Sequence, residues 1–373
     1  MKTAIFCVFF KNYLHYCYGR GDIFSVFLLR TAGLNGFGGI VFVDGNFLGL
    51  PENGDVVDVV ILQIPYELTT SYGQGTSQGP AACISASGQV ELFDPLLGSD
   101  LPNGNAIHTN EPWDGEGNSL LQQLDGISNY LQPWYAGDCF PISLGGEHGI
   151  LPPLVNATKT HPLICNDLSK LTIVQIDAHA DLRSQLDGEV YSHACAASRS
   201  LDLGVGKLLQ VGIRAFSQEE YQAIARDDRI TTFFASDTQN HSTGREVWQQ
   251  WLDTLSKIEG PVHLSIDIDG LDGSIVPATG TPVPGGLSYW QVVETIEALF
   301  NAQKATVISA DVNEIVPQID SPLTQFTAAM LTTKIVVNHF NAKDSGRWNS
   351  TVQQMGKSRL IGTSTFFQQE GGQ

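Results

Sequence analysis

Residues 171–181, Leu-Thr-Ile-Val-Gln-Ile-Asp-Ala-His-Ala-Asp, place an apolar run directly before a cluster of acidic and imidazole side chains. The run 171–176 is rich in β-branched residues and predicts a buried strand of a parallel sheet. Alternate side chains of an extended segment share a face, so we expect Asp177, His179 and Asp181 to converge. Neighbouring carboxylates repel each other unless a cation compensates them, so the segment favours a metal site over an accidental polar cluster.

A second acidic strand end lies in residues 262–273. The run 262–268 predicts another buried strand, and Asp267 and Asp269 share one of its faces. Two carboxylates that leave a core strand together are costly without a counter-ion. A pair of catalytic acids, as in glycosidases, is the alternative, but it leaves the histidine-bearing segment unexplained.

The third segment is Leu-Gly-Gly-Glu-His-Gly at residues 144–149. Its paired glycines allow a tight turn with close backbone approach, from which His148 projects. A lone histidine at a strand end is more often a packing residue than a ligand. Together, however, the three segments supply more ligands than the three or four typical of one zinc ion, and they suit two ions that share carboxylates. The excess of carboxylates favours a hard ion such as Mn²⁺.

Apolar runs and helical periodicities alternate along the rest of the chain. This alternation predicts an α/β fold of three layers, in which helices cover both faces of a mostly parallel sheet of about eight strands. Ligands of such sheets bind at the carboxyl ends of the strands, where the three segments lie. We expect strands at 56–64, 140–144, 171–176, 208–213, 230–234, 262–268 and 305–311, helices at 79–92, 120–131, 151–158, 218–226, 245–255, 289–300 and 324–340, and a long surface loop at 94–117.

The domain organisation follows from composition. Residues 46–341 show no compositional break and predict one domain. Residues 1–45 have no clean period and predict a dispensable extension, with a short targeting or membrane-associating segment as the alternative. Their apolar stretches are far too short to span a bilayer. Residues 342–373 are polar and predict a loose tail.

The net charge and the cysteine spacing exclude several kinds of partner and of site. The 373-residue chain carries a formal net charge of −19, which argues against nucleic acid and anionic membranes as partners and leaves room for a cationic substrate. None of the six cysteines forms a Cys-x-x-Cys pair, so neither a zinc ribbon nor a redox dithiol is indicated. Reduced thiols predict a cytoplasmic protein.

The three segments, in this order, resemble the ureohydrolase family, which includes arginase and agmatinase. Further matches are Tyr-Ser-His-Ala-Cys at 191–195, Thr-Gly-Thr-Pro-Val-Pro-Gly-Gly at 279–286 and Asp-Val-Asn-Glu at 311–314, and the resemblance covers residues 46–341. It implies an arginase-like fold, a guanidino substrate, release of urea and an amine, and assembly into trimers or hexamers.

The resemblance also implies a binuclear manganese centre, with Ni²⁺ as the alternative metal. A hydroxide between the ions would attack the guanidinium carbon. Asp181 would also orient that hydroxide, Glu314 would bind the guanidinium, and His193 would pass a proton to the departing amine. Structural alternatives remain for two of these residues, a helix or loop cap for Glu314 and a solvated loop histidine for His193. One ion would be held by His148, Asp177, Asp181 and Asp267, and the other by Asp177, His179, Asp267 and Asp269, so that Asp177 and Asp267 bridge.

The stretch after Asp181 bears on the substrate. Arginases bind the α-carboxylate and α-amine of arginine with an Asn-Thr-Pro-type run there, whereas this chain has Leu-Arg-Ser-Gln-Leu-Asp-Gly. The segment is more similar to that of agmatinases, which favours hydrolysis of agmatine to putrescine and urea in polyamine biosynthesis. Gly149 and Gly273 depart from the family pattern, in which Ser and Pro are usual. Guanidinobutyrate, another guanidino acid and guanidine therefore stay open as substrates, while arginase and a metal-dependent deacetylase are weaker alternatives.

Overall fold

The structure, a computed structural model, describes residues 43–52, 57–115, 117, 119–318 and 320–348, together with the backbone of three earlier strands. The chain divides into two compact units, Met1–Val41 and Phe42–Gln373. Strands β1 (Cys7–Phe10), β2 (Tyr13–Tyr18) and β3 (Ser25–Arg30) form an antiparallel sheet in the first unit. The extension therefore contains regular structure that its sequence pattern did not indicate.

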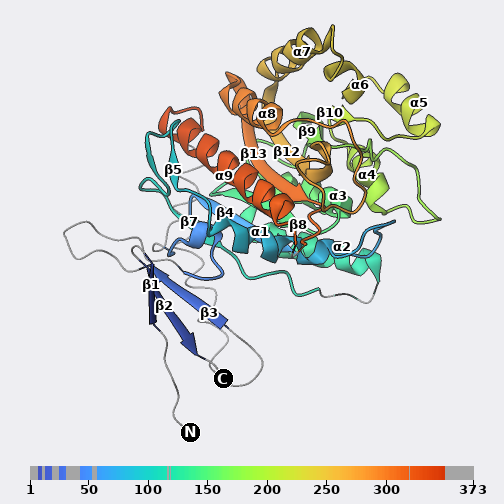
Figure 1. Cartoon of the computed structure of the whole chain (residues 1–373). Helices are drawn as coiled ribbons and strands as arrows, with labels where there is room; N and C mark the ends of the chain where they lie inside the picture. Colours follow the sequence, from blue (N-terminus) through green and yellow to red (C-terminus); the bar gives the residue numbers. More distant parts are fainter. Residues whose placement is uncertain are drawn as a thin grey trace, which may run out of the picture. The chain divides into compact units, whose positions relative to one another are not determined.

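The second unit is built on a sheet with the strand order β11-β10-β9-β12-β13-β8-β4-β7, in which every pairing is parallel (Figure 1). The expected α/β class and parallel sheet are confirmed. The strands are β4 (Val59–Ile64), β7 (Ile107–Thr109), β8 (Phe140–Gly145), β9 (Thr172–Ile176), β10 (Lys207–Ile213), β11 (Ile230–Phe234), β12 (Glu259–Asp267) and β13 (Lys304–Asn313).

One expectation was wrong within residues 94–117. This segment was expected to be a loop, but it contains the edge strand β7, which pairs with β4 from Val59 opposite Ile107. A strand of three residues is too short to produce a recognisable alternation, so only its pairing with β4 identifies it.

Helices cover both faces of the sheet. One layer contains α1 (Gly79–Ser87), α7 (Gly244–Ser256), α8 (Tyr289–Asn301) and α9 (Leu323–Asp344), and the other contains α2 (Leu120–Leu131), α3 (Leu151–Ala157) and α4 (Ala196–Asp202). Helices α5 (Gln218–Arg226) and α6 (Ala235–Thr238) follow β10 and β11. The short helices α4 and α6 were not predicted. None of the described helices is both long and apolar enough to cross a membrane.

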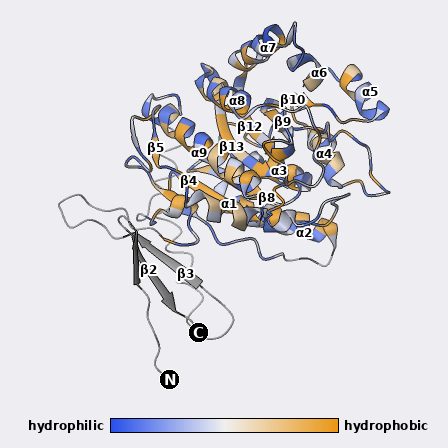
Figure 2. Cartoon of the chain, in the orientation of Figure 1, coloured by the Kyte–Doolittle hydropathy of each residue, from blue (hydrophilic) through white to orange (hydrophobic). Residues whose placement is uncertain are grey.

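Successive side chains of a strand point to opposite faces of the sheet, so the sheet separates the hydrophobic core into clusters on its two faces. In β4, Val59 and Ile61 pack in the cluster under α1, α8 and α9, whereas Val60 and Leu62 pack in the cluster under α2 and α3. Apolar residues accordingly follow the strands and the inner faces of the helices (Figure 2). Because helices cover both faces of the sheet, most residues of its central strands are buried, and buried polar residues such as Gln175, Gln210 and Ser265 have hydrogen-bond partners.

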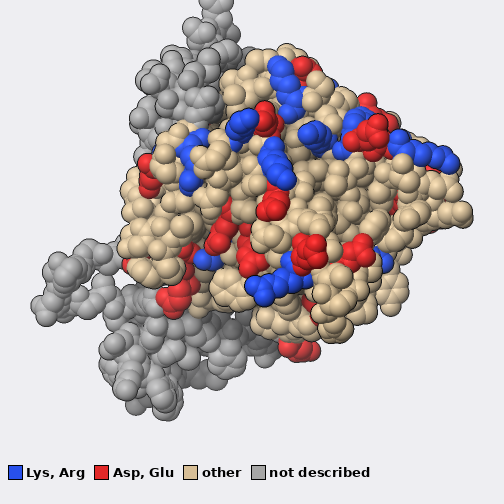
Figure 3. All heavy atoms as spheres, turned by 90° about the horizontal axis from the view of Figure 1, so that it is seen from above, with Lys and Arg blue, Asp and Glu red and all other residues tan. Residues whose placement is uncertain are grey.

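The surface of this unit carries charges of both signs. On the face seen in Figure 3, Asp and Glu side chains lie among Lys and Arg side chains rather than apart from them. This face offers no extended basic surface of the kind that binds a phosphate backbone.

Phe140 provides a test of the core. It is fully buried, and its ring stacks on His339 with a centroid distance of 4.4 Å and meets the edge of Trp348. The Phe140→Ala substitution should lower the free energy of unfolding by roughly 3–5 kcal/mol, because it leaves a cavity between sheet and helices. Urea denaturation measures the change, and Leu121→Ala, at an exposed position of α2, should shift it by less than about 0.5 kcal/mol. Equal losses in both variants would contradict this description of the core.

Candidate metal centre

The predicted ligands follow strands that are adjacent in the sheet. β8, β13, β12 and β9 are successive neighbours, and all of them end at the same edge. His148 begins the 3₁₀ turn that follows β8, Asp177 directly follows β9, Asp267 is the last residue of β12, and Glu314 directly follows β13. The topology therefore brings together residues that lie up to 166 positions apart in the sequence.

The first group of ligand atoms surrounds the ring of His148. Its Nδ1 lies 2.9 Å from Asp181 Oδ2, 3.1 Å from Asp177 Oδ2 and 3.6 Å from Asp267 Oδ2. All four side chains are buried. Within the described part of the chain, neither His148 Nδ1 nor Asp181 Oδ2 has a hydrogen-bond partner. A buried nitrogen that faces several carboxylate oxygens without an aligned hydrogen bond is typical of ligands placed around a cation.

The second group shares one residue with the first. His179 Nδ1 lies 3.0 Å from Asp269 Oδ2 and 3.8 Å from Asp177 Oδ1. Asp177 thus presents Oδ2 to His148 and Oδ1 to His179. Suitable donor atoms lie within 4.8 Å of one another both in the set His148, Asp177 and Asp181 and in the set Asp177, His179 and Asp269. A carboxylate common to both sets is the arrangement that a binuclear site requires.

A buried chain of hydrogen bonds fixes the tautomer of His148. Ser265 Oγ donates to Asp311 Oδ1 at 2.9 Å, and it lies 2.9 Å from His148 Nε2. The hydroxyl proton is committed to Asp311, so Ser265 accepts the Nε2–H of the imidazole. In the neutral ring, Nδ1 then has a lone pair that faces three carboxylates, an arrangement that a metal ion at this point would stabilise. The residues therefore fit a metal ion.

Two buried glutamines behind the cluster were given no role by the sequence. Gln175 Nε2 donates to Asp177 Oδ2 at 2.7 Å, and Gln210 Nε2 donates to Gln175 Oε1 at 2.9 Å. Both glutamines are fully buried in otherwise apolar strands. That position is the signal by which they could have been recognised, because buried polar side chains need partners.

The electrostatics of the cluster also favours a cation at this position. Burial and the neighbouring Asp181 raise the pKa of Asp177 to about 7, and burial with the nearby Asp269 raises the pKa of Asp267 well above its usual range. Burial alone would lower the pKa of His179, but Asp269 outweighs it and raises the pKa to about 10. In the absence of a metal ion, bound protons must therefore reduce the repulsion between these carboxylates.

Glu314 and His193 lie beside the cluster. Glu314 is buried, and its Oε1 accepts the backbone N–H of His148 at 2.8 Å, so it holds the turn that carries a predicted ligand. Its backbone has φ 64°, a left-handed conformation that costs about 1–3 kcal/mol and is found mostly at functional sites. His193 is half-buried and begins a turn that packs against the turn of His148. The structure thus brings all predicted site residues to one edge of the sheet.

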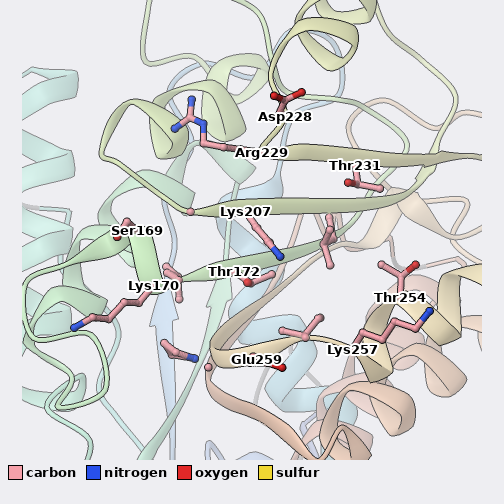
Figure 4. A pocket seen from close by; sticks show the side chains of 16 residues that line it. Ser169, Lys170, Thr172, Lys207, Asp228, Arg229, Thr231, Thr254, Lys257 and Glu259 are labelled. Atoms are coloured by element: carbon pink, nitrogen blue, oxygen red, sulfur yellow. The ribbon is translucent and has the colours of Figure 1, made fainter.

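A cleft of about 890 Å³ lies elsewhere. It is formed at the amino ends of β9, β10 and β12, where Thr172, Lys207 and Glu259 surround its opening (Figure 4). In parallel sheets ligands bind at the carboxyl ends, so the cleft and the predicted ligands occupy opposite edges. We therefore do not assign the cleft to the candidate metal centre.

Comparison with known proteins gives consistent results. The sequence model of the arginase family matches residues 57–337. An N(1)-aminopropylagmatine ureohydrolase of Thermus thermophilus is 35% identical over 292 residues, which cover 76% of this chain and 90% of that protein. An agmatinase of Bacillus anthracis is 31% identical over 266 residues, covering 70% and 85%. The crystal structure of agmatine ureohydrolase of Thermoplasma volcanium has a TM-score of 0.65 and 28% identity, covering 79% of this chain and 94% of that one.

Metal affinity should depend on pH. A proton on Asp177, whose pKa is about 7, or on His179, whose pKa is about 10, competes with a metal ion for the same atom. The apparent affinity for Mn²⁺ should therefore rise as the pH increases from 6 to about 9, and binding at pH 7.5 should release protons. Calorimetric titrations in buffers of different ionisation enthalpy measure both quantities. An affinity that is constant over this pH range would contradict the assignment.

Proposed function

Because the chain belongs to the arginase family and is a hydrolase of amidine C–N bonds, we propose that it hydrolyses agmatine to putrescine and urea, with two Mn²⁺ ions per chain. The observation that carries this proposal is the pair of His/Asp groups that share Asp177. His148, Asp177, Asp181 and Asp267 would hold one ion, and Asp177, His179, Asp267 and Asp269 the other. Ni²⁺ suits the same nitrogen and oxygen donors and is the alternative metal.

Two divalent ions at this site would lower the pKa of water and supply the nucleophile. The chain itself supplies binding and proton transfer. Asp181 Oδ2 has no hydrogen-bond partner among the described residues, so it can accept a hydrogen bond from the attacking water and orient it. Glu314 uses Oε1 for the His148 backbone, and Gly280 leaves room beside Oε2, because a Cβ there would lie 3.3 Å from that atom. A guanidinium can donate to Oε2 in this space.

The loop after Asp181 favours a substrate without an α-carboxylate. The backbone N–H of Leu182 donates to Glu220 Oε1 at 3.1 Å, and that of Ser184 donates to Glu219 Oε1 at 3.2 Å. These donors are therefore already bound to carboxylates of the chain itself. The carboxylate of arginine could not use these two N–H groups and would be repelled by Glu219 and Glu220, which leaves the guanidinium of Arg183 as the positive group of this loop.

N(1)-aminopropylagmatine is the second candidate substrate. Relatives that are 33% and 35% identical to this chain carry the name of its ureohydrolase. The exposed carboxylate of Glu219 would also attract the additional ammonium of this longer substrate. Guanidinobutyrate and guanidino acids share the unfavourable carboxylate of arginine. A cytoplasmic location, an assembly of three or six chains, and the domain limits at residues 45 and 341 stay predictions.

A urea-release assay tests the reaction. With Mn²⁺ supplied, kcat/KM for agmatine or its aminopropyl derivative should exceed that for arginine by roughly 100-fold, because about 2.7 kcal/mol of carboxylate repulsion and desolvation is avoided. Guanidinobutyrate, guanidine and Ni²⁺ are the comparison arms. Preferential hydrolysis of arginine would overturn the substrate assignment, and an absence of urea from every compound would overturn the proposed reaction.

Two variants separate metal binding from substrate binding. Asp177→Asn should abolish urea release and reduce the metal content, because it removes a shared ligand of both ions.

Glu314→Gln keeps the acceptor for the backbone N–H of His148 but loses the negative charge. The value of kcat/KM should therefore fall roughly 10–100-fold, with a raised KM and two metal ions retained. Elemental analysis and steady-state kinetics provide the measurements. Glu259→Gln, at the opposite edge of the sheet, is the control, and full metal content in Asp177→Asn would refute the ligand assignment.

A further inference from the structure

Glu147 lies directly before a predicted metal ligand and was given no role by the sequence. It is fully buried. Its Oε2 accepts the backbone N–H groups of Leu68 and Thr69 at 2.8 and 2.7 Å, and its Oε1 accepts the hydroxyl of Thr69 at 2.6 Å. A buried carboxylate with three such bonds is held in a single orientation. Glu147 therefore fixes the position of Thr69.

Thr69 connects this carboxylate to His193. Its Oγ1 accepts the backbone N–H of His193 at 2.9 Å and lies 3.3 Å from His193 Nδ1. A hydroxyl has one proton, and Thr69 donates it to Glu147 Oε1. Oγ1 therefore faces the imidazole as an acceptor. Thr69 Oγ1 is closer to Nδ1 than Ser192 Oγ, which lies at 3.4 Å, so in the neutral ring we place the proton on Nδ1. Nε2 then keeps the lone pair, to which the hydroxyl of Ser71, 3.4 Å away, can donate.

Gly149 makes the position of Glu147 possible. A Cβ at residue 149 would lie 2.9 Å from Glu147 Oε1 and 3.4 Å from Tyr66 Cε1. The first distance is closer than van der Waals contact allows, so any side chain there would displace the carboxylate.

We propose that Glu147 and Thr69 are positioning residues that set the tautomer of His193, and that Gly149 is needed to accommodate Glu147. The catalytic consequence rests on the proposed function. As the water oxygen bonds to the guanidinium carbon and the C–N bond breaks, Nε2 takes up the proton that the water releases and delivers it to the departing amine nitrogen. A ring with its proton on Nε2 cannot accept a proton at that atom.

Glu147→Gln tests the tautomer directly. The Gln amide would donate to Thr69 Oγ1, so the hydroxyl proton would turn toward His193 Nδ1 and the ring proton would move to Nε2. Two-bond ¹H–¹⁵N spectra of the histidine-labelled, zinc-loaded protein distinguish the tautomers at a pH where the ring is neutral, and the signal lost in His193→Gln gives the assignment. We expect Nδ1–H in the unchanged protein and Nε2–H in Glu147→Gln. The same tautomer in both would refute the proposal.

Thr69→Val tests the catalytic consequence. Loss of the hydroxyl should lower kcat for urea release roughly 100-fold with little change in KM and metal content, and Thr69→Ser should restore kcat to within about threefold. Thr70→Val is the matched control, because the described residues give its hydroxyl no hydrogen bond. Equal kcat in Thr69→Val and the unchanged protein would overturn the role. If the unchanged protein releases no urea, the proposed function fails while the spectra still decide the tautomer.

The dependence on Gly149 has its own test. Gly149→Ala should lower kcat as Thr69→Val does, since it displaces the carboxylate. Combining it with Glu147→Asp should recover part of the loss, because the shorter side chain vacates the space beside residue 149. If the double variant is no better than Gly149→Ala, the steric link between the two positions is wrong.

Discussion

Repulsion among buried carboxylates is the constraint on which the site depends. Asp177, Asp181, Asp267 and Asp269 lie at the ends of two adjacent strands, β9 and β12, and all of them are buried. Such a cluster is unstable unless protons or metal ions neutralise it. The raised pKa values of Asp177 and Asp267 express this instability. The parallel sheet imposes the proximity, and a bound cation would make it favourable.

The polar residues inside the sheet are the second requirement. Gln175 and Ser265 occupy positions that would otherwise be apolar, and each orients one predicted ligand by a hydrogen bond, Gln175 to Asp177 Oδ2 and Ser265 to His148 Nε2. A ligand held in this way presents one defined atom to the metal, so the geometry is set before an ion binds. Glu147 acts on His193 by the same principle, through Thr69 instead of directly.

The sequence predicted the site better than it predicted its surroundings. Asp177, His179 and Asp181 are separated by single residues, so strand periodicity alone implies that they share a face. Thr69 and His193 are 124 residues apart, and no local pattern links them. Helix α9 illustrates the same limit, because it continues to Asp344, four residues beyond the periodic stretch. There Lys343 donates to Asp58 and Asn105, which are distant in the sequence. Local periodicity predicts the conformation of the backbone and the face on which a side chain lies. Contacts between distant segments, such as that of Thr69 with His193, depend on how the layers pack.

The parallel sheet also separates the reactive edge from the edge that carries the cleft. β12 has nine residues, so its two ends are about 30 Å apart. The exposed amines of Lys170, Lys207 and Lys257 surround the cleft at the amino ends of the strands. Covalent attachment to a solid support through these amines would orient the protein with its catalytic edge toward the solution. These amines are therefore suitable attachment points for immobilising the protein.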